Sequence, residues 1–321
     1  LWQSSSRVVM RFVLQLRSYF RASVCGVVLF LGVIAPSAAF ALDVAVVVSQ
    51  RDGVHKAFAD AFMRAAAGLG HRVFDIGSPA EGVDDVALAR ADLVVASGEA
   101  AAELALARHA RPTLVTMIAR SRFEALRAAH PQAALSAWLL DQPVERQLRL
   151  LRAVVPERKR VGLLLGGNID AEAALHAAAA GFGLSLATRQ VRHDKALITG
   201  LEEVLSASEV LLALPDPMLS SPTAARSILL TSYRWQKPII AFSRAYVTAG
   251  ALAAVFITPE QVADDLIDWL RTQDGGTVTL PPPQEPVSFE IAVNRQVARA
   301  LGINVADDGE LLRLTAGGGR P

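Results

Sequence analysis

The chain has 321 residues, of which 52% are hydrophobic, and a formal net charge of +1 from 32 basic and 31 acidic residues. Its first 41 residues carry four arginines and no acidic residue, so the remainder holds 28 basic against 31 acidic side chains. This balance argues against a nucleic-acid-binding protein, whose binding face is strongly basic. The length is sufficient to bury one or two hydrophobic cores.

The first 41 residues have the pattern of a cleavable secretory signal peptide. A segment with three arginines precedes a 12-residue apolar run, Val24–Ala35, and Ala39-Phe40-Ala41 supplies small residues at a cleavage site. A membrane anchor is the alternative, but 12 residues fall short of the ~20 that span a bilayer. The single cysteine, Cys25, lies inside the apolar run, where a lipoprotein signal would not place it. We therefore expect export of a cysteine-free protein, which suits an oxidising compartment.

Strand and helix patterns alternate from Asp43 to Leu140. An unbroken apolar run such as Asp43–Val48 is typical of a parallel strand buried on both faces. The alternation predicts a twisted parallel sheet with helices on both faces. The expected strands are Asp43–Val48, His71–Ile76, Leu93–Ala96, Thr113–Ile118 and Leu135–Leu140, and the expected helices are Gly53–Gly68, Val86–Arg90, Glu99–Ala107 and Arg122–Ala129.

The alternation restarts after Asp141-Gln142-Pro143, which predicts a second lobe of the same α/β kind. The strands expected after this point are Val161–Leu165, Leu184–Thr188, Val210–Leu214, Pro238–Phe242, Ala251–Ile257 and Phe289–Val293. The helices expected after this point are Val144–Val155, Ala171–Ala180, Lys195–Ser206, Thr223–Tyr233, Pro259–Thr272 and Asn294–Leu301. A proline-rich linker, Pro281–Pro286, precedes the last strand.

Motifs of catalysis and of cofactor or metal binding are absent from the sequence. It contains no Gly-x-Ser-x-Gly, no phosphate-binding Walker loop, no Gly-x-Gly-x-x-Gly and no His-Glu-x-x-His. Its six histidines are scattered without the spacing of a metal site. We therefore expect a binding protein without cofactor or metal. An exported enzyme remains an alternative, for which Glu99 and Asp216 are the only acid pair to nominate.

Polar residues follow several of the predicted strands, at the edge where open α/β sheets bind their ligands. Ser49, Ser97-Gly98-Glu99, Asp216 and Ser243 all occupy such positions. Serine and glycine there expose backbone N–H groups at a helix N-terminus, which favours a carboxylate or phosphate. Asp216 is suited to a ligand ammonium and Tyr246 to stacking on a ring. The alternative for each residue is ordinary helix capping, in which serine and aspartate predominate.

The second half of the chain resembles the periplasmic substrate-binding proteins of ABC transporters, in the branch that is mostly uncharacterised or binds aromatic amino acids. The resemblance extends over residues 144–305 and depends on four segments: Leu214-Pro215-Asp216-Pro217, Ser232–Ser243, Ala249-Gly250-Ala251-Leu252 and Phe289–Ile303.

The resemblance implies two Rossmann-like lobes of the type I periplasmic-binding-protein fold, joined by a hinge that the chain crosses three times. We expect a signal peptide (1–41), an N-terminal lobe (42–141 with 242–280), a C-terminal lobe (142–241 with 281–312) and a flexible tail (313–321). The hinge segments are expected near Asp141–Pro143, Phe242–Arg244 and Pro282–Pro286.

The resemblance further implies a monomeric periplasmic protein that captures a small polar solute, with amino acids among the candidates, and delivers it to an inner-membrane ABC permease and its ATPase. The ligand-binding residues it suggests are Ser49, Ser97, Gly98, Glu99, Asp216, Ser243 and Tyr246. A periplasmic sensor that presents its ligand state to a membrane receptor such as a histidine kinase would need the same cleft. The sequence departs from the family at Ser97-Gly98-Glu99 and at Met117–Arg120, so the ligand of other members does not transfer to this chain.

Overall fold

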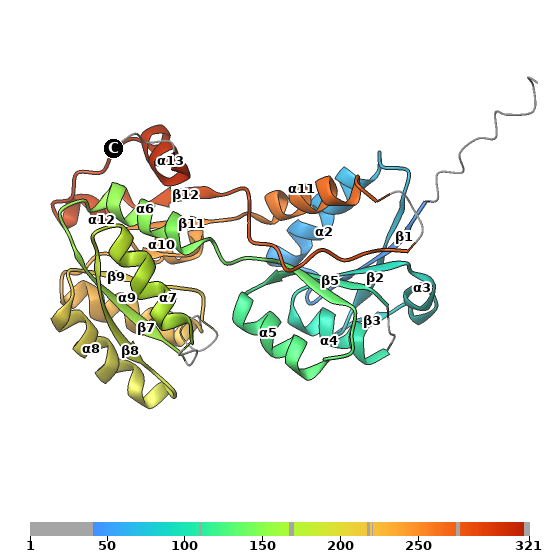
Figure 1. Cartoon of the computed structure of the whole chain (residues 1–321), viewed down its shortest axis with the longest axis horizontal. Coiled ribbons are helices and arrows are strands. Elements are labelled where there is room, and N and C mark those ends of the chain that lie inside the picture. The colour runs from blue at the N-terminus through green and yellow to red at the C-terminus, as the bar shows by residue number, and fades with distance from the viewer. Residues whose placement is uncertain are drawn as a thin grey trace, which may run out of the picture. The chain divides into compact units, whose positions relative to one another are not determined.

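A computed structural model of the chain describes residues 41–108, 111–166, 170–216, 219, 221–273 and 277–317. The described residues form two six-stranded sheets with helices on their faces (Figure 1). The signal peptide expected over residues 1–41 lies almost entirely outside them. Among the described residues, no helix combines the length and the apolar character needed to cross a membrane.

The first sheet has the strand order β3-β2-β1-β4-β5-β6. All neighbouring strands pair in parallel except β3, which forms a short antiparallel edge on β2 that the sequence did not indicate. The central strand reads DVAVVV and is buried on both faces, as expected for a parallel strand between two helical layers. The strands are β1 (Asp43–Val48), β2 (Arg72–Ser78), β3 (Gly82–Val83), β4 (Leu93–Ser97), β5 (Thr113–Ile118) and β6 (Leu135–Leu139).

Alternate side chains of these strands enter two separate hydrophobic layers. One layer packs against α2 (Gly53–Ala66) and α11 (Pro259–Leu270), which lie side by side in Figure 1. The other packs against α3 (Asp85–Arg90), α4 (Glu99–Arg108) and α5 (Arg120–Ala129). Helix α11 begins at a capping box, in which Thr258 and Gln261 each bond the other's backbone N–H.

The second sheet has the order β12-β11-β10-β9-β7-β8 and is parallel except for β12. One of its faces is covered by α6, α7, α12 and α13, and the other by α8, α9 and α10. The strands are β7 (Arg160–Leu165), β8 (Ser185–Gln190), β9 (Val210–Leu212), β10 (Ile239–Ala241), β11 (Ala253–Phe256) and β12 (Glu290–Val293). The helices are α6 (Val144–Val154), α7 (Asp170–Gly181), α8 (Leu197–Ala207), α9 (Pro222–Arg234), α10 (Arg244–Thr248), α12 (Arg295–Ala300) and α13 (Asp308–Ala316), with a 3₁₀ turn at Asp194–Ala196.

The chain passes between the two sheets at three places, and one of them differs from the prediction. The first lies between β6 and α6, and the third lies between Gln284, which pairs with Trp138, and β12; both overlap the predicted segments. The second lies after β11, which pairs with β10 and so belongs to the second sheet. Residues 242–256 were therefore assigned to the wrong lobe, and Phe242–Arg244 is not a crossing. The sequence pattern could not reveal this because a buried strand reads the same in either sheet.

The predicted start of the flexible tail at residue 313 is also too early. Helix α13 continues to Ala316, with Leu311 and Thr315 fully buried, and ends at Gly317 in the left-handed conformation. Leu311 joins the core of the second sheet, where α13 packs against α6. The remainder of the predicted tail, residues 318–321, lies outside the described residues.

Candidate functional site

A cavity of about 390 Å³ lies where the carboxyl ends of several strands meet the crossing segments. Its wall is formed by residues that follow β5, β6 and β9, by the end of β7, by the first turns of α6, by part of α7 and by Glu285 of the third crossing. The carboxyl ends of parallel strands are where open α/β sheets bind ligands. The lining residues include Arg120, Asp141, Gln142, Glu145, Gln147, Gly166, Asp216 and Glu285 together with aliphatic side chains.

Asp216 is the one predicted ligand residue that lines this cavity. Its Oδ2 accepts a hydrogen bond from the backbone N–H of Gly166 at 3.0 Å, and its Oδ1 accepts one from Leu219 at 3.2 Å. A Cβ at position 166 would lie 2.2 Å from Oδ2, so a side chain there would displace the carboxylate from this position. Asp216 is thus fixed between the ends of β9 and β7, and it does not cap α9, whose N-cap is Ser221.

Asp141, which follows β6, is a second carboxylate in the cavity wall. Its Oδ2 accepts a hydrogen bond at 2.6 Å from the backbone N–H of Arg120, the first residue of α5. Burial raises the pKa of Asp141 to about 6, although the Arg120 N–H acts in the opposite direction. The Arg120 side chain extends to Glu285, with 2.6 Å between Nη2 and Oε1.

Two buried glutamines line the same cavity beside Asp141. The Arg146 guanidinium donates to Gln142 Oε1 at 2.6 Å and to the Pro286 carbonyl at 3.0 Å, which ties the first crossing to the third. Gln147 Nε2 donates to the Gln142 carbonyl at 3.3 Å. These bonds orient both amides. They leave Gln142 Nε2 and Gln147 Oε1 buried and without a hydrogen-bond partner among the described residues.

Ser49, Ser97, Gly98 and Glu99 gather at the carboxyl edge of the first sheet, but they are not part of this cavity's wall. Ser49 Oγ accepts from the Ala101 N–H at 3.0 Å, and the buried Ser97 Oγ lies 3.0 Å from His55 Nδ1. Gly98 has a φ of +92°, and a Cβ there would lie 2.5 Å from both the His55 ring and Ser49 Oγ. Glu99 opens α4 and faces Arg122 at 3.6 Å.

His55, one of the six scattered histidines, is half-buried and contacts this serine–glycine cluster. Burial lowers its pKa, while nearby Asp52 acts in the opposite direction. The imidazole is therefore neutral at pH 7 and serves the cluster as a hydrogen-bonding group.

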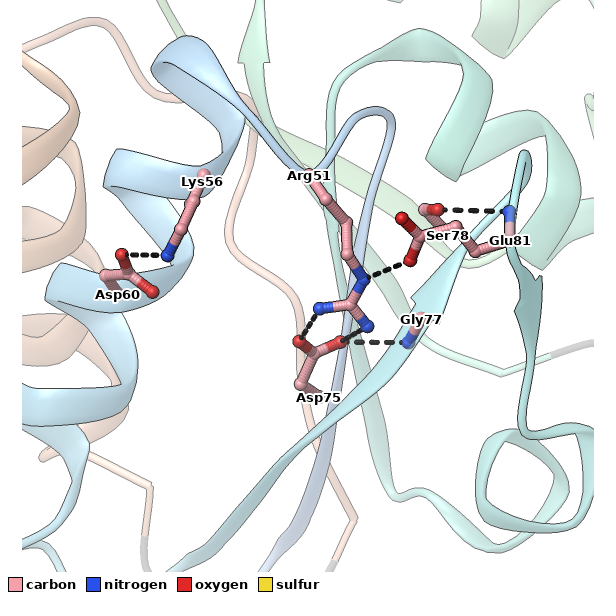
Figure 2. Close-up of polar contacts among 7 residues, drawn as sticks. All are labelled: Arg51, Lys56, Asp60, Asp75, Gly77, Ser78 and Glu81. Carbon is pink, nitrogen blue, oxygen red and sulfur yellow. Dashed lines mark hydrogen bonds and ion pairs between the residues drawn. The ribbon is translucent and has the colours of Figure 1, made fainter.

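Arg51, which follows β1 in the same loop as Ser49, is held by two carboxylates (Figure 2). Its Nη1 and Nη2 contact Asp75 of β2 at 2.6 and 3.2 Å, and its Nε lies 2.7 Å from Glu81. Asp75 also accepts from the Gly77 N–H at 2.9 Å. Arg51 therefore fixes its loop to β2, and its charge is already balanced within the first sheet.

Ser243 and Tyr246 lie in a different cavity, of about 520 Å³, between α9 and α10. Ser243 is the N-cap of α10, and its Oγ accepts from the Tyr246 N–H at 3.3 Å. The Tyr246 hydroxyl donates to the Leu219 carbonyl at 3.1 Å, and its ring packs on Phe242. Burial raises the pKa of Tyr246 to about 12, so the hydroxyl remains a donor. The structure gives both residues internal partners, and their ligand-binding role stays a prediction.

The sequence interpretation missed Arg120, Asp141, Gln142, Gln147 and Glu285 as site residues. Asp141 and Gln142 were interpreted only as hinge residues, and Arg120 only as a departure from a family pattern. Arg120, Asp141 and Gln142 nevertheless follow predicted strands, which is the signal that identified Asp216. Gln147 lies within the predicted helix Val144–Val155 and Glu285 within the linker Pro281–Pro286. Within the described ranges, no group of three or more His, Cys, Asp or Glu side chains could hold a metal ion.

Comparisons with known proteins address the family and the fold of the chain. A family profile described as ABC transporter substrate binding protein matches residues 139–313. The search of curated protein sequences gives no match.

Solved structures with a similar fold come from several bacteria. A conserved domain protein from Vibrio cholerae is 17% identical with a TM-score of 0.59, covering 84% of this chain and 96% of its own. An ABC domain from Streptococcus pneumonia in complex with L-Trp is 17% identical with a TM-score of 0.58, covering 84% and 97%. A ligand-free, open substrate binding protein with adhesive properties from Clostridium difficile is 16% identical with a TM-score of 0.60, covering 83% and 96%. At these identities, the likeness establishes the fold alone.

Proposed function

Because the chain belongs to the ABC transporter substrate-binding protein family, we propose that it captures a small polar solute in the cavity lined by Asp141 and Asp216. The bound solute is then delivered to an inner-membrane permease and its ATPase. Binding is the whole activity, and no covalent bond of the solute is made or broken. The protein acts as a monomer in the periplasm after removal of the segment that ends at Ala41.

The observation that supports this proposal most directly is the origin of the cavity wall. Arg120 and Ser121 follow a strand of the first sheet, whereas Gly166 and Asp216 follow strands of the second. Asp141 and Glu285 come from two of the three crossings. A solute in this cavity contacts both halves of the molecule together with the segments that join them. It therefore shifts a pre-existing open–closed equilibrium toward the closed state.

Four of the six remaining predicted residues have a place in this proposal. Ser49, Ser97, Gly98 and Glu99 lie at the carboxyl edge of the first sheet, the edge to which β5 and β6 bring Arg120 and Asp141. They would contact the solute in the closed state, with the Ser49 and Ser97 hydroxyls already oriented by Ala101 and His55.

Native mass spectrometry of the protein purified from the periplasm of its source cells tests capture and export together. The mature chain should begin near Leu42, and a fraction of it should carry one noncovalently bound small molecule. Mild heating or unfolding should release that molecule for identification. Full-length protein recovered from the membrane fraction would contradict export. Two results together would contradict capture. They are a protein mass without a bound molecule, even when dilution is kept small during purification, and no change in melting temperature with any member of a solute library.

A further inference from the structure

The wall of the 390 Å³ cavity is acidic. Among the described residues that line it, the charged side chains are four carboxyl groups and one guanidinium: Asp141, Glu145, Asp216, Glu285 and Arg120. Arg120 already forms an ion pair with Glu285 at 2.6 Å. The remaining three acids are provided by the first crossing, by α6 and by the end of β9.

This arrangement does not suit a ligand carboxylate. An anion in the cavity would face an excess of carboxyl groups, and the single cation among the described lining residues, Arg120, is engaged by Glu285. An ammonium group would instead meet the carboxyl groups of Asp141 and Asp216 and would offset the free-energy cost of burying the charge of Asp141. Zwitterionic α-amino acids combine one favourable and one unfavourable charge in this environment.

The uncharged part of the wall is mostly aliphatic. Leu164, Leu165, Leu175, Leu214 and Val144 line the cavity alongside the acids. Gln142 and Gln147 line it too, and each has a buried polar atom without a partner among the described residues. The wall thus suits a solute with an apolar body and a cationic end.

We propose that the solute is an organic amine, with an apolar body and no carboxylate, whose ammonium group is recognised by Asp141 and Asp216. This inference rests on the proposed function and names the chemical class that the same cavity takes. It differs from the amino acids that the family resemblance suggests.

Binding of an amine is linked to the ionisation of Asp141. The charged groups that act on Asp141 are Arg120 from α5 and Glu285 from the third crossing. Glu145 of α6 and Asp216 line the same cavity, and Arg146 of α6 bonds the neighbouring Gln142. Burial raises the pKa of the unliganded carboxyl to about 6, and a bound cation lowers it again. Amine affinity therefore falls as the pH drops below about 6, and binding near pH 6 releases protons.

Three matched pairs of probes test the inference by isothermal titration calorimetry at pH 7.5: tryptamine and L-tryptophan, phenethylamine and L-phenylalanine, and isopentylamine and L-leucine. Each pair shares its apolar body and differs by the carboxylate. In at least one pair the amine should bind at least about tenfold more tightly than its amino acid. Affinity for that amine should fall several-fold at pH 5.0.

Two variants complete the test. Asp141→Asn keeps an oxygen to accept from the Arg120 N–H but cannot carry charge, so it should lose at least about tenfold in amine affinity and most of the pH dependence. Glu103→Gln, on the exposed surface of α4 and outside the cavity wall, should bind as the parent does. Amino acids binding more tightly than their amines, or no amine binding at all, would overturn the inference. In either case, a small molecule found by native mass spectrometry would leave the proposed capture function intact.

Discussion

Replacing Asp216 by asparagine should weaken binding of the captured solute by roughly 2–5 kcal/mol while leaving the melting temperature close to normal. The loss follows from removing a charge that faces a cationic group in a desolvated cavity. Asparagine retains one of the two oxygens that accept backbone hydrogen bonds, so the cost in folding stability is limited to the other hydrogen bond, about 1 kcal/mol. Calorimetric titration with the solute identified by mass spectrometry, alongside a melting curve, measures both quantities.

Asp216→Ala measures the contribution of the same side chain to folding stability, separately from its contribution to solute binding. It leaves the N–H groups of Gly166 and Leu219 without their carboxylate acceptor. The loss of folding stability is roughly 1–3 kcal/mol for each of these groups that stays buried. Gly166→Ala should reproduce the binding loss, because a Cβ there collides with the carboxylate. Gly181→Ala is the matched control, since nothing lies within 4 Å of a Cβ at that position. Normal binding with a lowered melting temperature in Asp216→Asn would show that Asp216 only joins two strand ends.

Asp141→Asn should stabilise the solute-free protein at pH 7.5 by up to about 3 kcal/mol. A rise in pKa from 3.8 to about 6 means that ionising Asp141 costs this much more in the folded than in the unfolded chain. For a carboxyl group whose pKa is raised by folding, its contribution to stability is fully present below pH 3.8 and is lost as the pH rises through 6.

The gain in the free energy of unfolding of Asp141→Asn over the parent should therefore shrink between pH 6 and pH 4 and disappear below pH 4. Urea unfolding of the parent and the variant across this range gives the difference in the free energy of unfolding. Glu103→Gln, an exposed carboxyl-to-amide change, corrects for the effects of net charge. A variant that is less stable than the parent at pH 7.5 would mean that the Asp141–Arg120 hydrogen bond outweighs the cost of burial.

Much of the fold could be predicted from the sequence because its strands are buried runs between helix signals. β1, β5 and β7 were placed to within a residue, and the restart of the pattern after Asp141 indicated the second sheet. The missed elements are short or at an edge: β3 has two residues and α10 has five. Helix α13 was missed because its burial depends on a distant partner, α6. The position of the second crossing depends on strand pairing between β10 and β11, which local patterns do not encode.

The candidate site was predictable only in part, and for a related reason. Asp216 was found because it follows a strand and is preceded by proline. Asp141 follows a strand too, but its buried environment arises from Arg120 and Glu285, far away in the sequence. Ser243 also follows a strand, β10, and therefore matched the ligand-site pattern. In the structure its hydroxyl caps α10. A strand-end position identifies a candidate, and only the fold shows which cavity it lines.

Small-angle X-ray scattering with and without the identified solute tests the central claim of capture by both halves of the molecule. The radius of gyration should decrease when the parent protein is saturated, and it should remain at the solute-free value in Asp216→Asn at the same solute concentration. An unchanged radius for the parent at demonstrated saturation would contradict capture by closure and point to a rigid binding site.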